Sequence, residues 1–78
     1  MSCIKLKIDG NDFSVYYSSS SCNIIVQRNG LDFAISEEVI ILGKFKPPVH
    51  NRIVSELNSN LDLYRRALNK AKNLKAFL

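Results

Sequence analysis

Hydrophobic and polar residues alternate over much of the first 35 positions, as they do in half-buried β-strands. Ile4, Leu6 and Ile8 alternate with Lys5 and Lys7, and a period of two places one apolar row on a single face of a strand. The alternation returns over residues 13–17 and 31–35, and residues 23–27 form a further β-prone run. This pattern predicts an antiparallel β-meander of four strands within residues 1–35.

Two turn signals separate these runs. Asp9-Gly10-Asn11-Asp12 is rich in turn-forming residues. Asn29-Gly30 stands between apolar runs and favours a type I′ turn, which requires positive φ at both central residues. We therefore expect two hairpins, with the serines at 18–21 forming a loop or the frayed ends of two strands.

Residues 36–46 allow two interpretations. Ser36, Glu37 and Glu38 are typical of a helix N-cap followed by an acidic first turn. The continuous apolar run Val39-Ile40-Ile41-Leu42 would also suit a buried fifth strand. We favour a short helix and keep the fifth strand as the alternative, so that residues 3–42 contain four or five strands.

Residues 47–78 are predicted to be helical and to pack on the sheet. Pro47 and Pro48 suit a first helical turn, and apolar residues then recur at three- and four-residue steps. Asn58, Ser59 and Asn60 favour caps over helix interiors. Either one helix of about 28 residues runs through, roughly 42 Å long, or two helices meet at 58–60 and Asn60 caps the second. The whole chain, residues 1–78, is expected to form one α+β domain.

The apolar side chains of the C-terminal helix spread over an arc of about 160°, wider than the roughly 100° that packing on a sheet requires. The surplus predicts contact with a second surface, which is either another copy of the chain or residues 36–46. The residues expected to mediate self-association as a homodimer are Leu61, Tyr64, Leu68, Ala71, Leu74 and Leu78.

The positive charge gathers in the second half of the chain. Residues 1–43 contain three basic and five acidic side chains, whereas residues 44–78 contain eight basic and two acidic ones. Such asymmetry favours an acidic partner, although a solvated helix face would have the same composition. The expected partner-binding residues are Arg65, Arg66, Asn69, Lys70 and Lys72.

No combination of residues indicates catalysis or metal binding. His50 is the only histidine, and it stands at an expected helix start with no group near it in sequence to orient it. Cys3 and Cys22 lack the spacing of a zinc or redox motif, and we expect free thiols. Glu37 and Glu38 suit a helix start better than acid–base chemistry. The sequence therefore predicts a protein that is not an enzyme and has no cofactor or metal.

Two functions remain. The chain lacks an apolar run of membrane-spanning length and an apolar leader segment, so we expect a cytoplasmic protein. The favoured function is an adaptor or inhibitor that binds a larger protein or nucleoprotein complex with an acidic surface. The high content of Asn, Ile, Lys and Ser would suit a mobile genetic element. The alternative is direct binding of DNA or RNA by the basic helix.

Overall fold

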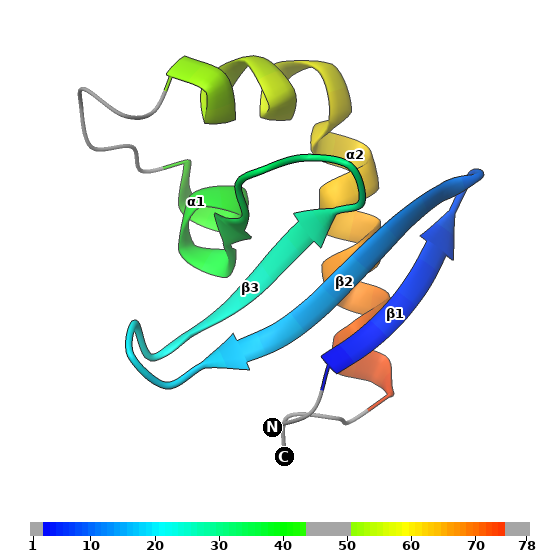
Figure 1. Ribbon diagram of the computed structural model, residues 1–78, viewed down its shortest axis with the longest axis vertical. Helices are drawn as coiled ribbons and strands as arrows, with labels where there is room; N and C mark the ends of the chain where they lie inside the picture. The colour runs from blue at the N-terminus through cyan, green and yellow to red at the C-terminus, as the bar shows by residue number, and fades with distance from the viewer. Residues whose placement is uncertain (1–2, 44–50, 75–78) are drawn as a thin grey trace.

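The computed structural model describes residues 3–43 and 51–74, which form a four-stranded antiparallel sheet and two helices. The elements in chain order are β1 (Cys3–Ile8), β2 (Asn11–Ser18), β3 (Asn23–Arg28), β4 (Ile35–Ser36), α1 (Glu37–Leu42) and α2 (Asn51–Asn73). The strands lie in the order β1-β2-β3-β4, and α2 lies across one face of the sheet (Figure 1). The predicted α+β meander with a helical region packed on it is confirmed.

The turn between β1 and β2 is a two-residue hairpin. Ile8 pairs with Asn11, and the two residues between them, Asp9 and Gly10, have φ angles of 49° and 83°. Positive φ at both central positions is the mark of a type I′ turn, which matches the right-handed twist of the flanking strands. The first predicted hairpin is therefore confirmed.

The second predicted hairpin is wrong in its turn type and in the length of its outer strand. Within the described chain only Gly30 of the Asn29-Gly30 pair has positive φ, at 94°. The N–H of Asn29 donates to the Asp12 carbonyl at 2.8 Å, so the chain is still bonded to the β2 side at that point. β4 then contains only two residues, with Ile35 opposite Val26.

A tertiary contact explains why residues 31–34 leave the sheet. Asp32 accepts hydrogen bonds from Arg52 of α2 at 2.6 and 3.3 Å, and the guanidinium of Arg52 lies 5.0 Å from the centre of the Phe33 ring. These contacts hold the loop against α2. The Asn29-Gly30 pair still forms a tight turn, in which the Leu31 N–H donates to the Arg28 carbonyl at 3.2 Å, but the turn is not of type I′ and residues 31–34 do not pair with β3.

The helical interpretation of residues 36–46 is confirmed for α1, and the fifth-strand alternative is wrong. The Ser36 hydroxyl accepts a hydrogen bond from the Val39 N–H at 3.4 Å, as an N-cap does. Gly43 ends the helix in the left-handed region at φ 66°, and its N–H donates to the Val39 carbonyl at 2.9 Å. Pro47 and Pro48 lie outside the described residues.

Helix α2 is bent at Asn60, whose φ and ψ of −135° and 21° are not helical. Of the two alternatives for residues 58–60, the structure has the break, but Asn60 does not cap the second segment in the expected way. Its side-chain Nδ2 donates to the carbonyl of Glu56 at 3.3 Å, which satisfies the end of the first segment. The bend turns residues 51–59 towards α1 and sends residues 61–73 along the sheet (Figure 1), so a straight overhanging helix is avoided.

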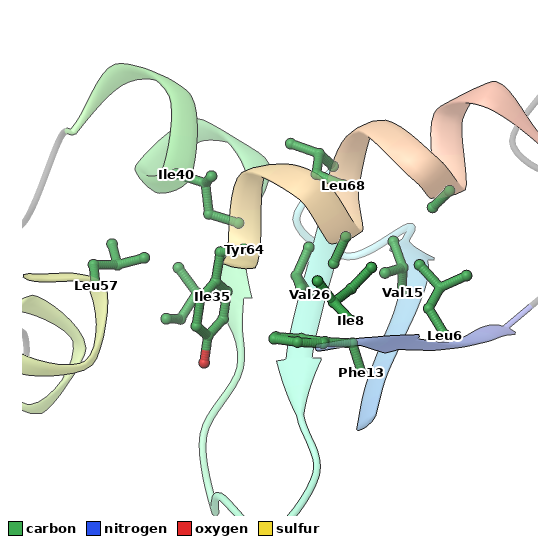
Figure 2. Packing of buried hydrophobic residues seen from close by; sticks show 12 residues of the cluster. Leu6, Ile8, Phe13, Val15, Val26, Ile35, Ile40, Leu57, Tyr64 and Leu68 are labelled. Carbon is green, nitrogen blue, oxygen red and sulfur yellow. The ribbon is translucent and has the colours of Figure 1, made fainter. Parts of the chain in front are cut away.

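The core fills the space between the sheet and the two helices. Figure 2 shows Val15 and Val26 of the sheet meeting Tyr64 and Leu68 of α2. The Phe13 and Tyr64 rings pack edge to face with centroids 5.2 Å apart. The buried residues are Leu6, Ile8, Phe13, Val15, Val26, Ile35, Ile40, Leu57, Tyr64, Ala67, Leu68 and Ala71. Within the described residues, no helix is long and apolar enough to cross a membrane.

Candidate protein-interaction surface

Some of the cations on the predicted basic face of α2 form ion pairs within the chain, and Arg66 is one of them. Its guanidinium donates to both carboxylate oxygens of Asp9, at 2.7 and 3.1 Å, and to Asp62 at 3.4 Å. This two-pronged contact fits the planar fork of arginine. It also holds the pKa of Asp9 below its usual value, first through the hydrogen bond and then through the nearby positive charge. Arg66 thereby joins the second segment of α2 to the β1–β2 turn.

Lys72 is also engaged within the chain. Its ammonium forms an ion pair with Glu37 in the first turn of α1, and the neighbouring Glu38 accepts a hydrogen bond from the Asn23 amide at 3.4 Å. The two adjacent carboxylates therefore have separate partners. They attach α1 to α2 and β3 and do not form a paired acid–base site.

Arg65 and Asn69 differ from these two cations in facing an apolar depression between the helices. Arg65 lines two adjoining hollows together with Ile41 of α1, and Leu42 and Leu61 line one of them while Asn69 lines the other. Among the described residues, Arg65 makes no salt bridge, so its charge is available to a partner. We call Ile41, Leu42, Leu61, Arg65 and Asn69 the α1–α2 surface.

The apolar part of this surface results from the shortness of α1. Ile40 is buried in the core at 1% exposure, but Ile41 and Leu42 remain 49% and 59% exposed. Successive helical residues point about 100° apart, so one isolated helix of six residues cannot bury all four side chains of the run Val39-Ile40-Ile41-Leu42 on one side. Our sequence prediction did not include Ile41 and Leu42, although that unbroken run was the available signal.

Lys70 is exposed but lies away from the α1–α2 surface. Lys70 comes five positions after Arg65, and this step places the two side chains about 140° apart around the helix. The five predicted partner-binding residues therefore do not form one patch. Arg65 and Asn69 face α1, Arg66 and Lys72 are paired with carboxylates, and Lys70 stands apart.

Four of the six predicted self-association residues pack in or against the chain's own core. Tyr64, Leu68 and Ala71 are buried in its own core, so they lie on no surface that a second copy could contact. Leu61 packs partly against that core, Leu74 is 59% exposed, and Leu78 lies outside the described residues. The wide apolar arc of α2 is accounted for by the sheet together with α1, and self-association through Leu61 and Leu74 stays a prediction.

A polar cluster that sequence patterns did not reveal lies where α2 bends. The Arg28 guanidinium of β3 and the Tyr64 hydroxyl both donate to Oε2 of Glu56, each at 2.7 Å. The Arg28 and Glu56 side chains are only 28% and 12% exposed. Burial, followed by the Glu56 hydrogen bond and charge, raises the pKa of the Tyr64 hydroxyl far above its ordinary value of 10.0. Because its members satisfy one another, the cluster stabilises the fold and leaves no free reactive group.

The described part of the chain does not group side chains as a metal site would. In residues 3–43 and 51–74, no three of the His, Cys, Asp or Glu side chains are grouped as metal ligands would be. Cys3 and Cys22 are separate, exposed thiols, and His50 lies outside the described residues. The expectation that the chain is not an enzyme stays a prediction.

Comparison with protein-family models, curated proteins and solved structures finds no match to this chain. The function is therefore inferred from its own surfaces.

Proposed function

We propose that this chain is a cytoplasmic adaptor or inhibitor that binds a larger protein through the α1–α2 surface. The observation that carries the proposal is the exposure of Ile41 and Leu42 beside the guanidinium of Arg65, which makes no salt bridge with any other described residue. Adjacent exposed aliphatic side chains lose water contact favourably when a partner covers them.

The composition of the surface defines the chemistry of the partner. Ile41 and Leu42 require an apolar patch, and Arg65 at the rim favours a carboxylate, which it can bind through two parallel hydrogen bonds. Asn69 supplies both a donor and an acceptor at the same rim. Arginine is one of the residue types enriched among interface hot spots. This chemistry retains the acidic partner that the sequence predicted but narrows the contact to Arg65 and Asn69.

Direct binding of nucleic acid has less support. Two of the cations that would contact phosphates, Arg66 and Lys72, already pair with Asp9 and Glu37. The exposed aliphatic pair beside Arg65 has no counterpart in the polar interfaces typical of DNA and RNA binding. A steep fall of affinity with salt, set by the number of phosphates neutralised, would instead favour this alternative.

Quantitative affinity capture from an extract of the native host tests the proposal. Three variants are compared with the unchanged chain, namely Ile41→Asp, Arg65→Glu and the control Lys70→Glu, which carries the same charge change as Arg65→Glu on another side of α2. Urea unfolding first establishes that each variant is folded. Arg66 and Lys72 are left intact because their reversal would disturb ion pairs within the chain.

We expect the unchanged chain to capture one protein whose captured amount falls about tenfold or more with Ile41→Asp and with Arg65→Glu. Lys70→Glu should capture the same amount as the unchanged chain. Equal capture by all four proteins would overturn the proposal, and so would loss that follows net charge alone and includes Lys70→Glu.

A further inference from the structure

Strand β1 is an edge of the sheet. Within the described residues it pairs only with β2, so the backbone groups of Cys3–Ile8 that point away from β2 have no strand partner. Figure 1 shows β1 at the outer border of the sheet, with α2 covering one face and not the edge. An exposed strand edge is a template for another strand, because the unpaired N–H and C=O groups can continue the ladder.

The inward side chains of β1 are slightly less covered than those of the inner strands. Leu6 and Ile8 point into the core but keep 8% and 6% exposure, whereas Val15 and Val26 on the inner strands are completely covered. A further strand beside β1, with apolar residues opposite this row, would cover what remains. On the other face, Lys5 and Lys7 are exposed.

The charges of β1 disfavour pairing with a second copy of the same strand. In an antiparallel pair, residues opposite each other lie on the same face. Two copies of β1 can pair over five residues in two antiparallel registers that keep Leu6 and its apolar neighbours of both strands on the same face. One places Lys5 opposite Lys5, and the other places Lys5 opposite Lys7. Like charges directly opposite each other are unfavourable, so these lysines act against pairing between copies.

The same lysines favour a strand with acidic residues at alternate positions. β2 already provides an example, because Asp12 lies opposite Lys7 in the register and its carboxylate is 3.8 Å from the Lys7 ammonium. We propose that β1 binds an extended acidic segment of a partner protein as a fifth, antiparallel strand. Glu or Asp residues of that segment lie opposite Lys5 and Lys7, and apolar residues lie opposite Leu6. This is a second surface, separate from the α1–α2 surface.

The probe for this proposal is the blocked peptide Glu-Val-Glu-Val-Glu-Val, added to the isotope-labelled chain and followed by the NMR shifts and exchange rates of the backbone amides. Two control peptides separate strand pairing from simple attraction. One is Glu-Glu-Glu-Val-Val-Val, which has the same composition, and the other is Lys-Val-Lys-Val-Lys-Val. The alternating acidic peptide should shift the amides of residues 3–8 and slow the exchange of those that point away from β2, whereas both controls should bind at least about fivefold more weakly.

Charge reversal supplies the matched variants. Lys5→Glu should weaken binding of the acidic peptide about fivefold or more and strengthen binding of the lysine peptide. Arg65→Glu, with the same charge change on the α1–α2 surface, should leave both unchanged. Equal binding of the permuted acidic peptide, shifts centred on α2 or an equal effect of the two variants would overturn the proposal, and so would the absence of any binding. None of these outcomes bears on the capture experiment at Ile41 and Arg65, so the two proposals fail separately.

Discussion

The hydroxyl of Tyr64 donates a hydrogen bond of 2.7 Å to Oε2 of Glu56, and these two residues lie on opposite sides of the bend at Asn60. Arg28 of β3 donates to the same oxygen, also at 2.7 Å. The bend is therefore fixed by side chains from both helical segments and from the sheet. The cluster therefore joins the two segments of α2 to each other and to β3.

Removal of the Tyr64 hydroxyl should weaken the fold. Tyr64→Phe keeps the ring packed against Phe13 but deprives a largely buried carboxylate of one donor, and such a bond contributes about 1–2 kcal/mol. Urea unfolding should show a decrease of that size in the free energy of unfolding. The control is Tyr16→Phe, for which a change within about 0.5 kcal/mol is expected. Equal effects of the two substitutions would contradict this role of Glu56.

The Tyr64 hydroxyl should also make stability sensitive to alkali. Burial, then the Glu56 hydrogen bond and charge, raise its pKa in the folded chain above 10.0. A group whose pKa is raised by folding stabilises the fold fully below its unfolded pKa, and this stabilisation is lost as the pH rises above about 10. Absorbance titration should show that a tyrosine stays protonated at about pH 11 while the chain is folded. Tyr64→Phe should remove that late-titrating group, and an unchanged titration curve would contradict the assignment.

The contact between Arg66 and Asp9 should produce the opposite dependence in acid. Arg66 lowers the pKa of Asp9 below 3.8, so its contribution to stability is present above that pH and is lost as the pH falls through the folded pKa. The unfolding temperature, measured from about pH 5 down to pH 2, should therefore decline less steeply for Asp9→Asn than for the unchanged chain. Asn is chosen because it tolerates the positive φ of this turn.

A double-mutant cycle isolates this contact from general charge effects. Arg66→Gln should reduce the same acid dependence, and the double variant should resemble Arg66→Gln, because Asp9→Asn then has no remaining contact to remove. Arg66→Gln alone also removes the contact with Asp62. Fully additive effects would show that Asp9 and Arg66 act separately.

Neighbouring residues of α1 should respond very differently to truncation. Ile40 is 1% exposed and Ile41 is 49% exposed. Ile40→Ala leaves a cavity between α1, the sheet and α2, and should lower the free energy of unfolding by about 2–4 kcal/mol. Ile41→Ala should change it by about 0.5–1 kcal/mol or less. If denaturant unfolding showed similar large decreases in the free energy of unfolding for both variants, Ile41 would belong to the core and would not be available to a partner.

Sequence reasoning predicted the elements that depend on local signals. The alternation of Ile4, Leu6 and Ile8 gave β1 its inner face, and Ser36 marked the start of α1. The Asn-Gly signal at residues 29–30 marked a real turn, but the strand expected directly after it is absent at residues 31–34. There Arg52, 20 residues beyond Asp32, holds the loop through contacts that no local pattern contains.

The binding surface was predictable only in part, because charge counts do not show which cations are already paired. Arg65 and Arg66 are adjacent and chemically identical. Arg66 nevertheless forms a hydrogen bond with Asp9, which lies 57 positions earlier in the chain, whereas Arg65 faces the depression beside α1. The exposure of Ile41 likewise depends on how α1 docks through Ile40. Both distinctions arise from tertiary packing and not from composition.

Photo-crosslinking in the native host tests whether the α1–α2 surface contacts a partner protein. A photoreactive phenylalanine analogue replaces Leu42 in one variant and Ser20 of the exposed β2–β3 turn in the other. We expect one discrete protein adduct from position 42 and none of that mass from position 20. The same adduct from both positions, or adducts from position 20 alone, would contradict this expectation.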